Sequence, residues 1–157
     1  MTTPADSPRR QNQSRLTMAL LVAARIYRRL VDRRLAEHQM SDARALPVLH
    51  IARAGNGMRQ GELADTIGVE GPTLVRLLDQ LGTAGLVERQ PDPLDGRAKT
   101  LHITQEGRLL ATKVESVLHD MRDQLFADVS DADIEATLRT LGALDRALKR
   151  EQRHGGE

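Results

Sequence analysis

The sequence has little or none of several residue types that define common classes of protein. Its 157 residues include no cysteine and two aromatic side chains, Tyr27 and Phe126. The lack of cysteine excludes disulfides, thiolate metal sites and cysteine-based redox sensing. The scarcity of aromatic side chains argues against binding of single-stranded nucleic acid by base stacking, and against an RNA-recognition sheet.

Long apolar segments are also missing. No run approaches the roughly 18 residues that a membrane-spanning helix needs. Residues 1–13 have no apolar segment behind their arginines, so no secretory signal is indicated. We expect residues 1–13 to be a disordered tail, residues 151–157 to be a frayed tail, and the protein to be cytoplasmic. Residues 14–150 are long enough for one domain with a substantial core.

Catalytic and metal-binding patterns are absent as well. No histidine lies three or four residues from another, and no HExxH spacing, GxSxG motif or glycine-rich phosphate loop occurs. His50 is predicted to be a core or interface histidine. A zinc site assembled from separate elements stays open, but these residues predict neither an enzyme, a metal site nor a cofactor.

The charge is unevenly distributed along the chain, although the net charge is only +1. Residues 1–58 carry 10 Lys and Arg against 4 Asp and Glu, whereas residues 59–104 carry 5 against 7, a formal charge of −2. Charge alone therefore does not indicate a nucleic-acid-binding protein. Any such function has to be argued from the pattern of the residues.

Apolar residues at helical spacing predict six helices. They cover residues 14–38, 41–54, 62–67, 71–85, 105–129 and a last helix from residue 130 onward. Ser41 is a plausible N-cap for the second helix, and Pro47 predicts either a kink in it or a shifted start. Pro72 suits the first position of the fourth helix. Asp131 and Asp133 belong to helix capping rather than to catalysis.

Residues 86–90 and 100–103 are predicted to be two short strands, since Leu101 and Ile103 alternate with Thr100 and His102, and the polar sequence PDPLDGRA between the strands is typical of a turn. Residues 62–67, a turn at Gly68 and the helix that begins near Gly71 have the lengths of a helix-turn-helix. The predicted fold is therefore mainly α with a small β-hairpin wing, a winged helix-turn-helix.

This fold would present a small set of side chains to DNA. The start of the second helix of the motif offers free N–H groups to a phosphate near Gly71 and Pro72, and Thr73 and Arg76 could reach a base edge or a phosphate. In the hairpin turn, Arg97 could enter a minor groove. The remaining candidates in that turn are Asp95, which could hold the Arg97 guanidinium, and Lys99.

A plainer interpretation of the same residues stays open, in which the helix pair has no ligand and Arg76 and Arg97 are ordinary solvated charges. The apolar stripes of residues 14–38, 105–129 and the last helix could not all be covered within one compact unit, so a two-fold homodimer is expected. Arg25, Arg28 and Arg29 form either a solvated face or a set that contacts phosphates or a partner subunit.

Residues 67–108, IGVEGPTLVRLLDQLGTAGLVERQPDPLDGRAKTLHITQEGR, resemble the recognition helix and wing of the MarR family of bacterial regulators, and are most similar to its SlyA-like branch. The segments that carry the resemblance are residues 72–76, 78–81, 85–87, 95–99 and 101–104 together with Gly107. The helix order extends it over residues 14–150, although only residues 59–107 hold specific motifs.

The resemblance implies a homodimer whose dimerisation helices lie at residues 14–38 and 105–150, around a winged helix-turn-helix at residues 41–104. It implies binding to pseudo-palindromic double-stranded promoter DNA, with Thr73 and Arg76 in the major groove and Arg97 in the minor groove, oriented by Asp95. Many members respond to small phenolic or other lipophilic effectors held between the dimerisation helices and the winged unit.

Three positions depart from the family pattern. Arg59 replaces the usual Ser or Thr cap of the third helix, and Gly96 replaces a basic residue of the wing. Arg44 and Ala45 replace the His-Trp pair of the SlyA-like branch, which removes aromatic lining from the expected ligand pocket. The sequence predicts a DNA-binding repressor without a membrane partner, and the alternative is a helical interaction dimer whose winged unit binds protein.

Overall fold

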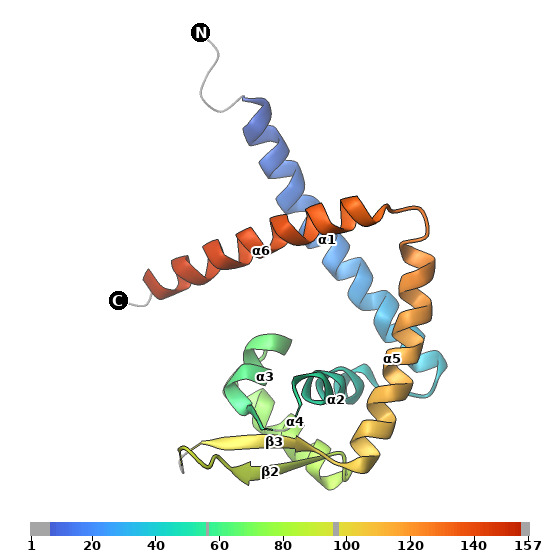
Figure 1. Ribbon diagram of the computed structural model, residues 1–157, viewed down its shortest axis with the longest axis vertical. Helices are drawn as coiled ribbons and strands as arrows, with labels where there is room; N and C mark the ends of the chain where they lie inside the picture. Colours follow the sequence, from blue (N-terminus) through green and yellow to red (C-terminus); the bar gives the residue numbers. More distant parts are fainter. Residues whose placement is uncertain (1–6, 56, 96–97, 155–157) are drawn as a thin grey trace. The chain divides into compact units, whose positions relative to one another are not determined.

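The structure is a computed structural model that describes residues 7–55, 57–95 and 98–154. By their internal contacts the residues divide into two units, Met1–His119 and Asp120–Glu157. The elements follow the order shown in Figure 1. They are α1 (Pro8–Glu37), α2 (Asp42–Ala54), β1 (Met58–Arg59), α3 (Gln60–Ile67), α4 (Gly71–Thr83), β2 (Val87–Pro91), β3 (Lys99–Ile103), α5 (Gln105–Leu125) and α6 (Asp131–His154).

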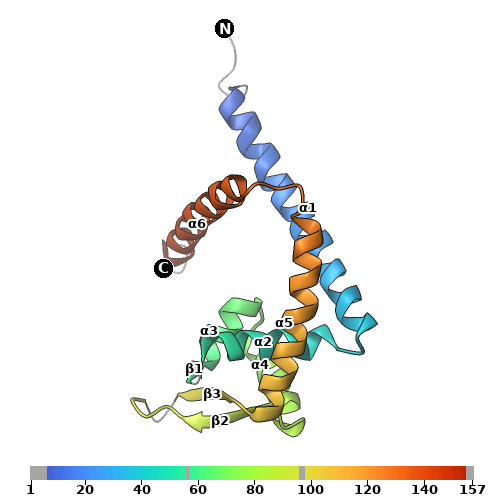
Figure 2. The ribbon, with the colours of Figure 1, turned by 45° about the vertical axis from the view of Figure 1, so that its right-hand side comes forward.

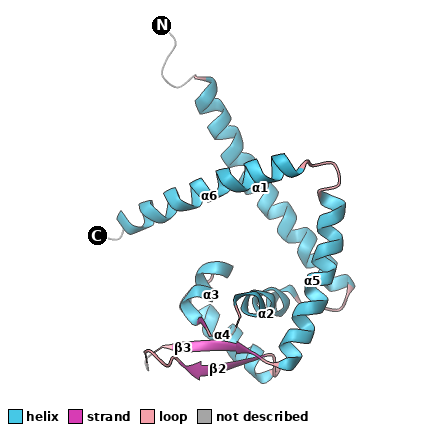
Figure 3. Ribbon diagram, viewed as in Figure 1, coloured by secondary structure: helices cyan, strands magenta, loops and turns pink. Residues whose placement is uncertain are grey.

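The sheet contains the predicted hairpin and one strand that the sequence did not indicate (Figure 3). Strand β3 lies between β1 and β2, and both pairings are antiparallel. Val87 lies opposite Ile103 at the root of the hairpin, and Pro91 lies opposite Lys99 at its far end. Strand β1 has only two residues, which is too short for an alternating pattern to be recognised.

The core of the first unit is built from apolar side chains of its helices and of the central strand β3. The side chains that are almost fully buried are Leu35, Val48, Ile51, Leu63, Leu78, Leu81, Leu101 and Val114. They come from α1, α2, α3, α4, β3 and α5. The fourth helix, which the spacing of apolar residues predicted, thus buries Leu74, Leu78 and Leu81, and the helix-turn-helix and the hairpin share one core.

The joint between the hairpin and α5 is closely packed around Thr104 and Gly107. The Thr104 hydroxyl donates to the Gly85 carbonyl at 2.7 Å and accepts the Gly107 N–H at 3.0 Å, so it caps α5 while holding the end of α4. A Cβ on Gly107 would lie 2.2 Å from the Leu86 carbonyl oxygen. Only glycine fits there without a shift of the backbone.

Several helix ends differ from the sequence-based prediction. Helix α1 begins at Pro8 rather than at residue 14, because Ser7 caps it through a 3.4 Å bond from the Arg10 N–H and a proline suits the first turn. Residues 1–6 of the predicted tail lie outside the described residues. The expected tail at residues 151–157 was also partly wrong, since α6 continues to His154.

Helix α5 ends at Leu125 and not at residue 129. Residues 126–129 form a turn, in which the Val129 N–H donates to the Phe126 carbonyl at 2.9 Å, before Ser130 caps α6 by accepting the Asp133 N–H at 3.2 Å. Helix α2 starts at Asp42, directly after the predicted cap position Ser41, so Pro47 does not shift its start. Pro47 is buried within the helix, where it offers no N–H to the carbonyl one turn earlier.

Several helices expose large apolar side chains, and α1 exposes the most. On α1 these are Leu16, Met18, Leu20, Leu21, Val22, Ile26 and Tyr27, and on α6 they are Leu138 and Leu148. The N-terminal half of α1 extends away from α2, α3 and α4 (Figure 2), so the first unit does not cover it. Among the described residues, no helix combines the length and apolar character that crossing a membrane requires.

Candidate nucleic-acid interface

Helices α3 and α4 form the predicted helix-turn-helix. The turn begins at Gly68, whose φ of 68° and ψ of 42° place it in the left-handed region that favours glycine. The N–H groups of Gly68 and Val69 both donate to the Ala64 carbonyl, at 2.9 and 3.1 Å, and so close the end of α3. Leu63 and Leu74 are buried beneath the two helices. This packing fixes the direction in which α4 leaves the turn.

The first turn of α4 is exposed. Gly71 and Pro72 are its first two residues, one position later for the proline than predicted, and both lie on the surface. Thr73 and Arg76 are exposed too, on the side away from the buried Leu74 and Leu78. The N–H groups of a first helical turn make no bonds inside the helix, so this end favours an anion.

The hairpin turn can be described only in part. Gly96 and Arg97 lie outside the described residues, so the predicted contact between Asp95 and Arg97 stays untested. Asp95 is exposed, and its carbonyl accepts the Ala98 N–H at 2.9 Å. Lys99 is the exposed first residue of β3. The described candidates of the turn are thus on the surface.

An ion pair between the half-exposed Arg59 and the buried Asp92, at the base of this turn, was not recognised in the sequence. The Asp92 side chain is 5% exposed, and its Oδ2 accepts bonds from Arg59 Nε at 2.9 Å and Nη2 at 2.8 Å. The hydrogen bond from the Leu94 N–H, followed by the contact with Arg59, outweighs burial and lowers the pKa of Asp92 below its ordinary value. Asp92 is therefore ionised at neutral pH.

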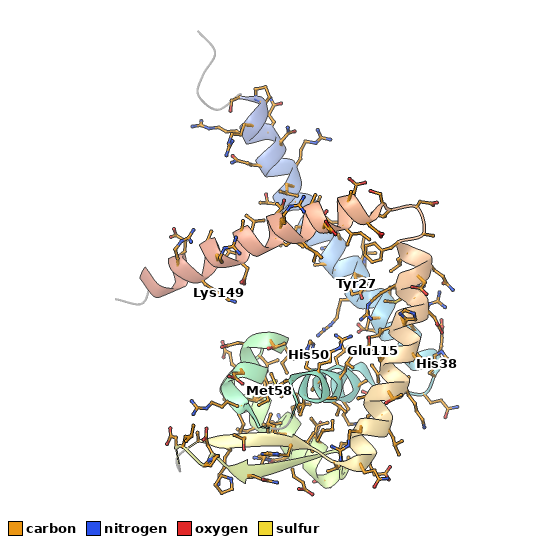
Figure 4. The ribbon with its side chains drawn as sticks, in the orientation of Figure 1. Tyr27, His38, His50, Met58, Glu115 and Lys149 are labelled. Atoms are coloured by element: carbon orange, nitrogen blue, oxygen red, sulfur yellow. The ribbon has the colours of Figure 1, made fainter. Side chains whose placement is uncertain are left out.

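A second ion pair joins α4 to the sheet. Arg89 on β2 pairs with Asp79, which lies on the C-terminal half of α4. A third pair, between Arg53 on α2 and Glu115 on α5, is bidentate, with distances of 3.0 Å from Nε and 2.7 Å from Nη2. Figure 4 labels Glu115. Arg53 and Glu115 are 62 positions apart, and Asp79 and Arg89 are 10 positions apart on different elements, so helical or strand spacing gave no signal for either pair.

A cavity of about 450 Å³ lies beside the start of α4. Its lining comes from four helices and the turn between α3 and α4: Arg28, Ala43, Leu46, Pro47, His50, Thr66, Ile67, Val69, Thr73, Arg76, Leu77 and Gln80. Two of the predicted DNA-contacting side chains, Thr73 and Arg76, are therefore also cavity residues. The sequence did not predict which residues line this cavity, because they are spread over distant parts of the chain.

His50 lies on the wall of this cavity rather than in the core, and it is half-buried on α2 (Figure 4). Burial, followed by the positive charges of Arg53 and Arg28, lowers the pKa of His50 below 6.5. The imidazole is thus mainly neutral at pH 7. Arg25, Arg28 and Arg29, whose role the sequence left open, are all exposed on α1, and Arg28 also belongs to the cavity wall.

Metal-binding side chains do not gather in the described part of the chain, where no group of three or more His, Cys, Asp or Glu is placed to hold a metal ion. The features that stand out are therefore the exposed start of α4, the hairpin turn, and the cavity lined by α1, α2, α3 and α4.

Comparison with known proteins gives consistent matches. The model of the MarR family matches residues 38–98. The crystal structure of the transcriptional regulator PA3341 is 33% identical with a TM-score of 0.78, over 86% of this chain and 98% of that chain. A crystal structure of MarR is 27% identical with a TM-score of 0.62, over 86% and 98% of the two chains. The S. aureus MepR–DNA complex, at 20% identity and a TM-score of 0.70 over 84% and 95%, shares the fold.

Proposed function

The chain belongs to the MarR family of transcriptional regulators, and on this premise we propose that it is a ligand-responsive repressor that binds pseudo-palindromic, double-stranded promoter DNA as a homodimer. The family consists of transcription regulators and not of enzymes. The observation that carries the proposal is the exposed surface of the first two turns of α4, which holds Thr73 and Arg76 while Leu74 and Leu78 anchor the helix in the core.

In this proposal α4 enters the major groove with its N-terminal residues toward the bases. Arg76 donates to a guanine edge or a phosphate, and Thr73 bonds a phosphate or a base. The N–H groups of Gly71 and Thr73, on either side of Pro72, which has none, bind a phosphate at the helix start, where the helix dipole favours an anion. Because residues 59–104 have a formal charge of −2, a few placed groups supply the specificity.

The hairpin turn is proposed to contact the neighbouring minor groove. Arg97 would insert its guanidinium, Asp95 would orient it, and Lys99 would contact the backbone. Asp95 and Lys99 are both exposed and lie on either side of Gly96 and Arg97 in the sequence, which supports such a contact.

A homodimer is supported by the apolar side chains that α1 and α6 leave exposed. Tyr27 and Leu20 on α1 are 39% and 40% exposed, and Leu138 on α6 is 62% exposed. Large apolar side chains gathered along one helix favour burial against another chain. Two copies related by a two-fold axis would place two α4 helices on successive turns of a duplex, as a palindromic site requires.

The cavity beside α4 is the proposed effector site. Arg28 and Arg76 give it two positive groups, while Leu46, Ile67 and Leu77 supply apolar wall, so it suits a small lipophilic acid. Thr73 and Arg76 belong both to this wall and to the proposed DNA contact, so a bound ligand would compete with DNA for them. The wall contains no Phe, Tyr or Trp, which disfavours effectors held by ring stacking.

Selection of bound sequences from a random pool of double-stranded DNA tests the proposal. We expect two related half-sites about one helical turn apart, and an affinity that falls steeply as the salt concentration rises. A pool that yields no enriched sequence, together with no DNA binding at low salt, would refute DNA recognition. It would favour the interaction dimer that binds protein instead.

A further inference from the structure

We propose that Arg59 and Asp92 act as a positioning pair that fixes the wing, meaning β2, β3 and the turn between them, against the helix-turn-helix. The pair would thereby set how strongly the DNA that flanks the half-site contributes to binding. The inference rests on the proposed DNA binding, but one of its two tests needs no DNA.

Asp92 forms hydrogen bonds with residues on both sides of the turn of the wing. Its Oδ1 accepts the Leu94 N–H at 2.8 Å, and its own backbone N–H donates to the Ala98 carbonyl at 3.1 Å. Its Oδ2 is left for the Arg59 guanidinium, which approaches through two nitrogen atoms at 2.9 and 2.8 Å. One carboxylate therefore shapes the turn with one oxygen and anchors it with the other.

Arg59 lies at the start of the helix-turn-helix, opposite the wing residue Asp92. It is a residue of β1 and the N-cap of α3, and its N–H donates to the Glu62 carboxylate in the first turn of α3 at 3.0 Å. Its backbone position is thus fixed by the helix-turn-helix, while its side chain reaches the wing. Figure 2 shows β1 at the start of α3, beside β3.

The pair reaches farther along the wing than the backbone pairing of β1. Strand β1 pairs with β3 only at Leu101 and Thr100, whereas the hairpin continues to Pro91 and Lys99 before the turn at Asp92. The side-chain contact therefore restrains the part of the wing that lies beyond the last β1 pair. Because Asp92 is buried, water screens this contact less than it screens an exposed pair.

The first test measures amide hydrogen exchange in the full chain without DNA, in Arg59→Met and in Asp92→Asn. Loss of the contact should increase exchange of the Leu94 and Ala98 amides about tenfold in both variants. Arg53→Met is the matched control, because Arg53 also pairs with a carboxylate and its side chain is 48% exposed against 50% for Arg59. Unchanged exchange in both wing variants would overturn the proposal.

The second test compares DNA that carries a selected half-site flanked by A-tracts or by G·C pairs. Both variants should lose most of the preference for A-tract flanks, with about tenfold weaker binding to the A-tract site, while discrimination within the half-site persists. Asp92→Asn gives the sharper outcome. Removing a negative charge strengthens DNA binding by electrostatics alone, so weaker binding points to positioning.

Two results would contradict the inference. If Arg59→Met weakens binding and Asp92→Asn strengthens it, Arg59 contacts a phosphate directly and does not act through the wing. If both variants lose affinity equally for every DNA, including random sequence, the pair supports folding only, and thermal unfolding checks this. Should the wild-type protein bind no DNA, the recognition part fails with the proposed function, whereas the exchange rates decide the positioning part separately.

Discussion

Replacing Arg76 with alanine separates recognition of a base from attraction to the DNA backbone. The side chain is exposed on α4, so its removal opens no space in the core and should change the free energy of unfolding by less than about 0.5 kcal/mol. If Arg76 reads a guanine, the variant loses about 1–3 kcal/mol of binding free energy on the selected site. That corresponds to roughly 5- to 140-fold in Kd.

The assay is fluorescence anisotropy with the selected site and with a scrambled duplex, each at several salt concentrations. Base recognition predicts a loss on the selected site alone. A phosphate contact predicts an equal loss on both duplexes. It also predicts that the slope of log Kd against the logarithm of the salt concentration decreases by about one. Lys113→Ala is a suitable control, since it removes one exposed positive charge on α5, outside the helix-turn-helix and the wing. Unchanged affinity of Arg76→Ala for both duplexes would refute the placement of α4 in the major groove.

Three further predictions concern folding and assembly. Gly107→Ala should lower the free energy of unfolding by about 1–3 kcal/mol, because the added Cβ would lie 2.2 Å from the Leu86 carbonyl oxygen. Urea titration measures this change, and a value near zero would show that the backbone around Gly107 shifts to accept the Cβ. The pKa of His50 is below 6.5 in the folded state, so the unfolded chain binds more protons and stability should fall as the pH drops through about 6.5; His50→Gln should flatten this dependence, and an identical pH profile would contradict it. Leu20→Glu should shift the protein from dimer to monomer in light scattering, since Leu20 lies on the exposed apolar surface of α1; an intact dimer would place the interface elsewhere.

The elements with a long apolar repeat were predictable from the sequence. Leu74, Leu78 and Leu81 recur on one side of α4 and are buried as expected, and Gly68 turns the chain at the predicted position. Helix ends without apolar residues were not predictable from this repeat. The first turns of α1 are polar, and only the Ser7 cap followed by a proline marks where the helix begins.

The spacing of residues along the sequence could not predict contacts between residues that are distant in the chain. Arg59 stood out only as an unusual cap, whereas the structure shows its guanidinium bound to Asp92, 33 positions away. The cavity draws Arg28, His50 and Arg76 from three helices. The burial of Asp92 could not be inferred either, since an aspartate between two prolines is typical of an exposed turn.

Thr73 and Arg76 each have two proposed roles, and this has a consequence for how the protein evolves. In the proposed function these side chains line the effector cavity and also contact DNA, so one substitution alters two recognitions at once. A lineage that adapts to a new effector through either position would change its operator preference in the same step. Descendants should therefore diversify first at cavity positions away from the DNA, such as Ala43 and Leu46 on α2, where selection on the effector can proceed independently.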